Sequence, residues 1–224
     1  MRILKSAAPR LAELKICYFF TGMLLGDETL LPEEFELVRD SNDTRRKEFA
    51  TGRYCARQAL SGLGYGPGVC LPRGPFREPV FPHGTVGSIS HTDGLTCAVA
   101  GDSAQFRAIG VDVQILGRPV SADAAGQILN PEEEFWKSVP DGILTVFSLK
   151  EAFFKMTRRL TDMPFWFDRV SVFPGETNGS VEYHFETPRG KAFHPGEYRI
   201  ENGYVFSLSF CAKGHSIPGI TPRT

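Results

Sequence analysis

The sequence predicts an α+β fold made of two similar halves with a ligand cleft between them. Amphipathic helical patterns at about residues 43–63 and 143–159 are each followed by segments of strand character. The turn dipeptides Asp93-Gly94 and Asn202-Gly203 predict a β-hairpin in each half and lie about half a chain length apart. We therefore expect two packed α/β halves. Because the halves share little sequence identity, a coincidence of spacing explains this offset as well as a duplication does.

The chain of 224 residues is long enough to bury a sizeable core, and we expect its halves to span residues 1–108 and 109–224. Hydrophobic residues make up 42% and charged residues 23% of it, which excludes a disordered or coiled-coil chain. The 25 Lys and Arg residues balance 26 Asp and Glu residues, so the net charge is −1. This balance lacks the basic excess of a general nucleic-acid binder, and we expect neither a nucleic acid nor a membrane as partner.

The first apolar segment, Ile16–Leu25, follows several basic residues and so imitates the apolar part of a signal peptide. It is too short to cross a bilayer, and its aromatic and β-branched residues favour a buried strand instead. The five cysteines lie far apart and form no CxxC pair, as expected in a reducing compartment. We therefore expect a cytoplasmic protein.

The first long helix is expected at about Asp43–Leu63. Asn42 offers an N-cap and Gly62 a C-terminal stop. Apolar residues recur at helical spacing along one face of this segment. Beside that face runs a stripe of three arginines, Arg46, Arg53 and Arg57.

A proline-rich connection separates this helix from the first strands. Val86–Ser90 and the segment LTCAVAG flank the Asp93-Gly94 turn, and Phe106–Val113 predicts a further strand. In the second half a helix is expected at Ile143–Arg159. The strand candidates after it are residues 168–173, 180–187, 197–201 and 204–214.

Glu151 gives the strongest indication of chemistry, because it falls on the apolar face of the second helix. A carboxylate there is costly unless a cation pairs with it. The strand sequence GVDVQ adds Asp112 and Gln114 on one face. Carboxylates and a carboxamide without neighbouring His or Cys favour Mg²⁺ over Zn²⁺. The alternative for Glu151 is an ion pair with Lys155, one helical turn away.

Phosphate-binding candidates surround these acids. Magnesium sites with few protein ligands borrow oxygens from a phosphate-bearing substrate. Lys150 and Lys155 flank Glu151 and each suits a phosphate contact, with a solvated helix lysine as the alternative. Ser90 and His91 end a strand beside a tight turn, where a hydroxyl, an imidazole and backbone N–H groups can bind an anion. Because consecutive strand residues point to opposite faces, a catalytic Ser-His bond is not expected.

Four segments, RRKEFATGRYCAR, SISH, GVD and KEA-x-x-K, occur in an order and spacing typical of one family. The chain resembles the 4′-phosphopantetheinyl transferases, in the longer monomeric bacterial branch of the enterobactin and surfactin-synthetase type. The resemblance spans about Arg45 to Lys155 and implies a fused pair of similar α/β halves. It also implies the reaction: with Mg²⁺, coenzyme A donates its phosphopantetheine arm to a serine of an apo acyl or peptidyl carrier protein, releasing adenosine 3′,5′-bisphosphate. Carrier proteins of siderophore, secondary-metabolite or fatty-acid biosynthesis are the partners that it implies.

The resemblance further implies a role for each motif residue. Asp112, Gln114 and Glu151 would hold the metal. Glu151 would also take the proton from the serine, and Lys155 would neutralise the diphosphate. The implied contacts to coenzyme A are Ser90 and His91 with its phosphates, Arg45 and Arg53 with the 3′-phosphate, and Arg77, or in its place Arg73, near the adenine.

Two positions qualify this assignment. Relatives commonly carry an acid where this chain has Gln114, so weaker metal affinity is expected. Glu133 occupies a place where relatives have an acid that orients a metal-bound water, or it is an exposed charge in the first turn of a helix. Two other functions stay open: a non-catalytic module that binds coenzyme A or a carrier protein, and a metal-dependent hydrolase that removes the arm.

Overall fold

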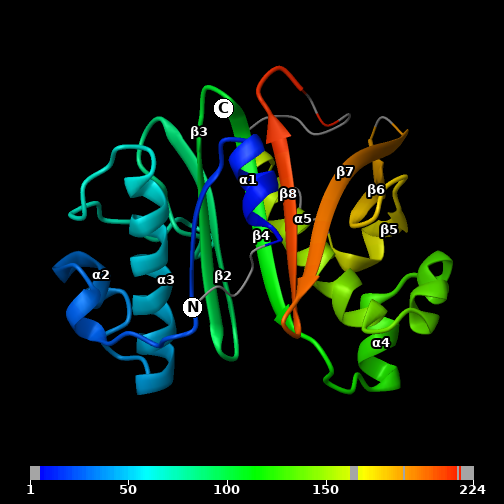
Figure 1. The fold of residues 1–224 in the computed structure, drawn as a ribbon, viewed down its shortest axis with the longest axis horizontal. Helices are drawn as coiled ribbons and strands as arrows, with labels where there is room; N and C mark the ends of the chain where they lie inside the picture. Colours follow the sequence, from blue (N-terminus) through cyan, green and yellow to red (C-terminus); the bar gives the residue numbers. More distant parts are fainter. Residues whose placement is uncertain (1–5, 162–165, 189, 216, 218–224) are drawn as a thin grey trace.

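Two antiparallel sheets form the framework of the protein (Figure 1). The computed structural model describes all residues except 1–5, 162–165, 189, 216 and 218–224. The first sheet has the order β1-β3-β2, formed by Cys17–Thr21 (β1), Thr85–Thr92 (β2) and Leu95–Asp102 (β3). The second has the order β4-β8-β7-β6-β5, formed by Phe106–Ile115 (β4), Val170–Pro174 (β5), Ser180–Thr187 (β6), Gly190–Glu201 (β7) and Tyr204–Ala212 (β8). Together with the helices, the sheets confirm the α+β class.

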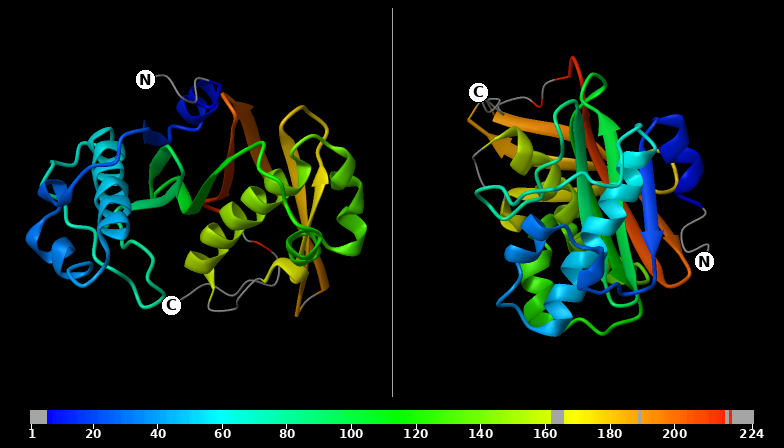
Figure 2. Two further views of the ribbon diagram at one scale, coloured as in Figure 1. Left: turned by 90° about the horizontal axis from the view of Figure 1, so that it is seen from below. Right: turned by 90° about the vertical axis from the view of Figure 1, so that its left-hand side faces the viewer.

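One long helix covers a face of each sheet. The helix α3, Asp43–Ser61, begins where the Asn42 side chain accepts a hydrogen bond from the Arg45 backbone N–H, and it packs on the first sheet. The helix α5, Gly142–Leu160, packs on the second sheet. Figure 2 shows α3 at the end of the molecule away from β5 and β6. The shorter helices are α1 (Ala8–Glu13), α2 (Pro32–Glu36) and α4 (Ala122–Ile128), and the 3-10 helices are η1 (Asp27–Thr29), η2 (Pro131–Ser138) and η3 (Phe167–Arg169).

The two sheets meet where β2 lies beside β4, and serine side chains join them there. The Ser88 hydroxyl accepts a hydrogen bond from the Val111 backbone N–H at 3.1 Å. Two residues further along β2, the Ser90 hydroxyl accepts one from Val113 at 3.3 Å. Because β2 and β4 belong to different sheets, these contacts satisfy N–H groups on the edge of β4 that a backbone ladder would otherwise bind.

A shared hydrophobic core also connects the two sheets. Leu11 of α1 packs with Val99 of β3, Val111 of β4 and Phe206 of β8 in one buried cluster. Figure 1 shows α1 in front of β4 and β8, and α5 behind them. Burial of these side chains is the main force that holds the sheets together.

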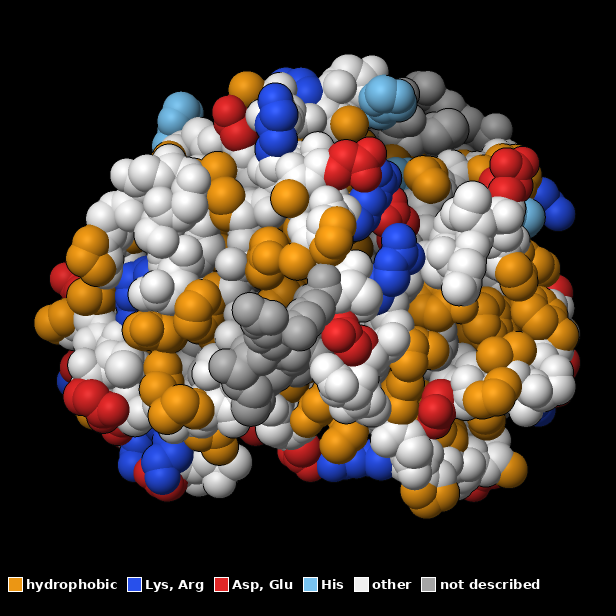
Figure 3. Space-filling model, in the orientation of Figure 1, with side chains coloured by type: hydrophobic (Ala, Val, Ile, Leu, Met, Phe, Trp, Pro, Cys, Tyr) orange, Lys and Arg blue, Asp and Glu red, His pale blue; other side chains and the backbone are white. Residues whose placement is uncertain are grey.

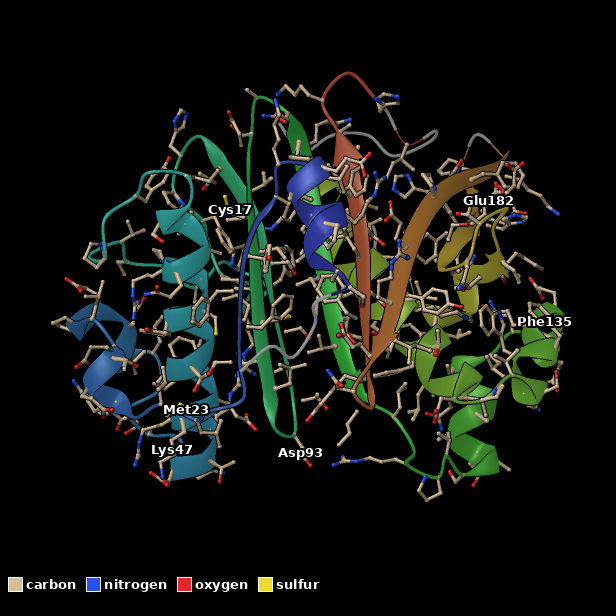
Figure 4. All side chains as sticks on the ribbon, in the orientation of Figure 1. Cys17, Met23, Lys47, Asp93, Phe135 and Glu182 are labelled. Atoms are coloured by element: carbon tan, nitrogen blue, oxygen red, sulfur yellow. The ribbon has the colours of Figure 1, made fainter. Side chains whose placement is uncertain are left out.

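The tip of the β2–β3 hairpin is fixed to the second sheet. Asp93, labelled at the tip in Figure 4, pairs with Arg118, and its carbonyl accepts a hydrogen bond from the Tyr204 hydroxyl at 3.3 Å. Elsewhere on the surface acidic and basic side chains are interspersed (Figure 3), in keeping with the net charge of −1.

The structure confirms most of the predicted elements and corrects one. Both long helices, the β2–β3 hairpin and the turn at Asn202-Gly203 are present. The prediction of a buried strand over Ile16–Leu25 is wrong in extent and burial: β1 ends at Thr21, and Met23 beyond it is 70% exposed. The physical reason is that β1 is an edge strand, paired with β3 alone. No helix among the described residues is long and apolar enough to cross a membrane. The internal duplication stays a prediction.

Candidate functional site

A cleft of about 390 Å³ opens where α3, β2, β4 and α5 converge. It brings together nine of the ten predicted site residues: Arg45, Arg53, Arg77, Ser90, His91, Asp112, Gln114, Glu151 and Lys155. Sequence reasoning missed Glu48 and Phe49, which also line it. Both follow Arg45 by about one helical turn, so the helical period could have placed them beside it.

Asp112 is the most tightly held residue of the cleft. Its side chain is 3% exposed, and its Oδ1 accepts hydrogen bonds from Ser90 Oγ and Lys155 Nζ, both at 2.7 Å. Its Oδ2 accepts one from Gln114 Nε2 at 2.9 Å. A carboxylate offers only acceptors, so Gln114 must present its amide N–H to Asp112, which leaves the Gln114 carbonyl oxygen for another partner.

Glu151 has no such partners. Among the described residues its carboxylate makes no hydrogen bond or ion pair, since Lys155 turns to Asp112. The predicted alternative, a Glu151–Lys155 ion pair, is therefore wrong. Burial raises the pKa of Glu151, Lys155 lowers it, and the nearby Asp112 carboxylate raises it further. Two carboxylates that lie close together and are partly buried repel each other, and a cation bound between them would stabilise their charged forms.

The opposite wall of the cleft carries Arg45 and Arg53 together with one acid, Glu48, which pairs with Arg45 at 3.4 Å. Arg53 is 4% exposed, and its guanidinium lies 4.3 Å from the centre of the Phe49 ring. Its buried Nε has no hydrogen-bond partner within the described part of the chain. Burial lowers the pKa of Arg53 to about 10. Because no carboxylate of the described residues pairs with it, the charge of Arg53 is left for an anion entering the cleft.

The other arginines of the predicted stripe have different partners. Arg57 forms a buried ion pair with Glu34 of α2 at 2.7 Å, and Arg46 pairs with Asp27 of η1 at 3.1 Å. These two therefore anchor the segment before α3, and only Arg53 faces the cleft.

The structure distinguishes the two arginines that were candidates for the same role, Arg77 and Arg73. Arg77 lines the cleft, whereas Arg73 donates a hydrogen bond to the Leu37 carbonyl at 2.8 Å and does not line it. The His91 side chain is 39% exposed, and its Nε2 lies 3.9 Å from a carboxylate oxygen of Glu48. Burial of the rest of the ring lowers the pKa of His91.

Lys150 is the one predicted site residue outside the cleft, and the prediction that it binds a phosphate is corrected. Its ammonium is buried and donates to Glu133 Oε2 at 2.6 Å, to the Ile128 carbonyl at 2.8 Å and to the Phe167 carbonyl at 3.0 Å. All three N–H bonds are thereby used inside the protein.

Both expectations for Glu133 are also wrong. Its carboxylate is fully buried and accepts further hydrogen bonds from the backbone N–H groups of Asn130 and Val172, at 2.7 and 2.6 Å. It is neither an exposed charge nor a group of the cleft. Instead Glu133, together with Trp136, whose indole donates to the Val172 carbonyl, satisfies the outer edge of strand β5.

The donor set of the cleft fits a hard cation. No three His, Cys, Asp or Glu side chains in the described part of the chain cluster as a metal site. Asp112 and Glu151 nevertheless face one cavity together with the Gln114 carboxamide. Two carboxylates and an amide oxygen are ligands that suit Mg²⁺, which keeps several waters and shares phosphate oxygens.

Comparison with known proteins identifies the family of the chain. Residues 33–101 match the family model of the 4′-phosphopantetheinyl transferase N-terminal domain. The chain is 31% identical over 183 residues to 4′-phosphopantetheinyl transferase Npt of Nocardia iowensis, covering 80% of this chain and 81% of that protein. It is 35% identical over 150 residues to 4′-phosphopantetheinyl transferase Svp of Streptomyces mobaraensis, covering 64% and 60%. Enterobactin synthase component D of Escherichia coli is 33% identical over 130 residues, covering 54% and 59%. Because the match to the Nocardia iowensis protein covers most of both chains, the chain belongs to the 4′-phosphopantetheinyl transferase family and is an enzyme of that class.

Proposed function

We propose that this enzyme transfers the 4′-phosphopantetheine arm of coenzyme A to a serine of an apo acyl or peptidyl carrier protein, with Mg²⁺, and releases adenosine 3′,5′-bisphosphate. The observation that carries the proposal is the polarity of the cleft, which has an unpaired buried guanidinium on one wall and two carboxylates on the other. The 3′-phosphate of coenzyme A suits the guanidinium, and its diphosphate would meet the two carboxylates through Mg²⁺.

Arg53 supports the assignment of the 3′-phosphate end. A guanidinium that is already desolvated and lacks a carboxylate gains a strong, geometrically defined partner when a phosphate binds. Arg45 and His91 line the same cleft and would add a charge and a hydrogen bond. Arg77 would lie near the adenine.

Asp112 and Glu151 would hold the metal, and the Gln114 carbonyl oxygen would bind it directly or through a water. When bound, Mg²⁺ supplies positive charge to the oxygens of the diphosphate. Lys155 also uses its three N–H bonds inside the protein, donating to Ser90 Oγ, the Val111 carbonyl and Asp112 Oδ1. Because its side chain is 26% exposed and borders the cleft, unlike that of Lys150, it would give up the contact with Asp112 for a diphosphate oxygen.

Glu151 is the proposed general base. Its carboxylate makes no hydrogen bond or ion pair in the described structure, and burial raises its pKa, which strengthens it as a base. The serine oxygen attacks the phosphorus that carries the pantetheine, and its proton passes to Glu151. The bond from that phosphorus to the bridging oxygen breaks, and the electron pair leaves with adenosine 3′,5′-bisphosphate.

The test is intact-mass analysis of apo acyl and apo peptidyl carrier proteins after incubation with the enzyme, coenzyme A and Mg²⁺. We expect a mass increase of one phosphopantetheine, lost with Asp112→Asn or Glu151→Gln. Binding of coenzyme A without any mass increase, across several carriers, would contradict the proposal and favour the non-catalytic module.

We also propose a cytoplasmic monomer with two halves that divide between residues 108 and 109, within strand β4. Sedimentation of the purified protein tests the monomer, and cell fractionation tests the location.

A further inference from the structure

The Ser90 hydroxyl has three polar neighbours. Its Oγ lies 2.7 Å from Asp112 Oδ1, 3.0 Å from Lys155 Nζ and 3.3 Å from the Val113 backbone nitrogen. Ser90 is only 4% exposed, so solvent has little access to its hydroxyl. One hydroxyl can donate one hydrogen bond and accept two, and all three are accounted for.

The direction of each bond follows from the chemistry of the partners. An ammonium group and a backbone N–H can only donate, so the Ser90 oxygen accepts from Lys155 and Val113. Asp112 is the one acceptor among the three neighbours, and the hydroxyl proton therefore points to its Oδ1. Ser90 has no donor left for a phosphate of coenzyme A.

We propose that Ser90 is a positioning residue for Asp112 rather than a phosphate contact, an inference that rests on the proposed function. Its hydroxyl fixes Oδ1 while Gln114 fixes Oδ2, which sets the carboxylate plane of Asp112 before metal or substrate arrives. Partners that hold a metal ligand in this way typically change metal affinity by 10-fold to 100-fold when they are removed.

Ser88 provides a matched control on the same strand. It lies two residues before Ser90 on the same face of β2, is 5% exposed, and accepts a hydrogen bond from Val111 as Ser90 does from Val113. It makes no hydrogen bond to Asp112 or Lys155 among the described residues. Ser88→Ala thus removes one contact between β2 and β4 and leaves Asp112 untouched.

The experiment measures two affinities of the full-length protein. Mn²⁺ binding in the presence of saturating coenzyme A is followed by electron paramagnetic resonance, and coenzyme A binding without metal by calorimetry. We expect Ser90→Ala to weaken Mn²⁺ binding about 10-fold or more and to leave metal-free coenzyme A binding unchanged. Ser88→Ala should match the wild type in both.

Two results would overturn the inference. Equal loss of metal-free coenzyme A affinity and of Mn²⁺ affinity in Ser90→Ala would show a phosphate contact, and equal effects of the two alanine variants would show a general role in packing. Thermal unfolding checks that each variant folds. If Ser90→Ala does not fold, Ser90→Cys, whose thiol is a weaker donor, takes its place under the same criteria. Wild-type protein that fails to bind Mn²⁺ with coenzyme A would instead contradict the metal site of the proposed function.

Discussion

Lys150 and Lys155 lie on the same helix and have opposite surroundings. Lys150 is enclosed with Glu133, whereas Lys155 borders the cleft. We expect Lys150→Met to lower the free energy of unfolding by roughly 3–5 kcal/mol, because it leaves the buried Glu133 carboxylate without its cation. Coenzyme A affinity of the folded protein should not change. Chemical denaturation and calorimetry measure the two quantities.

Lys155→Met is the matched variant. It should weaken coenzyme A binding about 10-fold or more, because a charge-assisted contact to phosphate is lost, with a smaller effect on stability. The assignment would be contradicted if Lys150→Met lost coenzyme A affinity and Lys155→Met kept it.

His194 makes stability depend on pH. Burial lowers its pKa to about 4 from an ordinary value of 6.5, and its Nε2 lies 3.1 Å from the Phe210 carbonyl, the geometry of an N–H donor. The unfolded chain takes up a proton below pH 6.5 and the folded protein only near pH 4, so stability is lost as the pH falls through that window. The loss amounts to at most about 3 kcal/mol.

The variant His194→Gln keeps an amide donor for Phe210 but does not titrate. Between pH 6.5 and 4 its free energy of unfolding should fall less steeply than that of the wild type. Parallel curves for the two proteins would exclude His194 as the source.

At the scale of the elements, the contact between β4 and α5 determines the geometry of the site. Gly110 of β4 lies so close to α5 that an added Cβ would meet the Ala152 carbonyl oxygen at 1.9 Å. Gly110→Ala must therefore displace the helix that carries Glu151 from the strand that carries Asp112. We expect a loss of roughly 1–3 kcal/mol in stability together with weaker Mn²⁺ binding in the presence of coenzyme A.

Gly126→Ala is the control for this change. It lies within α4, where an added Cβ meets no atom within 4 Å, so the substitution should raise stability by up to about 1 kcal/mol. Denaturation and metal titration of both variants test the pair. Unchanged metal affinity in folded Gly110→Ala would contradict the role of this contact.

The long elements could be predicted from sequence because their signals are local. Asn42 caps α3, and the Asn202-Gly203 turn closes the β7–β8 hairpin, where Asn202 has the positive φ of 53° that this turn needs. The short helix α2 was not predicted, because a buried ion pair with a distant residue, Glu34 with Arg57, holds it. A helical turn at Glu133 was among the expectations, but its burial and its ion pair with Lys150 were not, because they depend on tertiary packing.

The same distinction applies to the site. Asp112 and Glu151 were predicted to share a cavity, and they do. The surroundings of Lys150 were not predicted. Adjacent helix residues point about 100° apart, so Lys150 cannot share the face of α5 that carries Glu151, and the helical period could have shown this. Its actual partner, Glu133, is reached only through tertiary folding, which no local pattern specifies.

For the whole molecule, the shared core predicts a single cooperative unfolding transition. The cluster that joins Leu11 and Val99 to Val111 and Phe206 spans both sheets. Both tryptophans, Trp136 and Trp166, lie in the C-terminal half, so their fluorescence reports on that half, whereas far-ultraviolet circular dichroism reports on all helices and strands. The two signals should coincide, and separate midpoints would show that the halves unfold independently.

The most direct measurement is a crystal structure of the protein with coenzyme A and Mn²⁺, in which anomalous scattering locates the metal. We predict an anomalous peak in contact with the carboxylates of Asp112 and Glu151 and with the diphosphate, and the 3′-phosphate against Arg53. A peak away from both carboxylates, or coenzyme A bound outside the cleft between α3 and α5, would contradict the account.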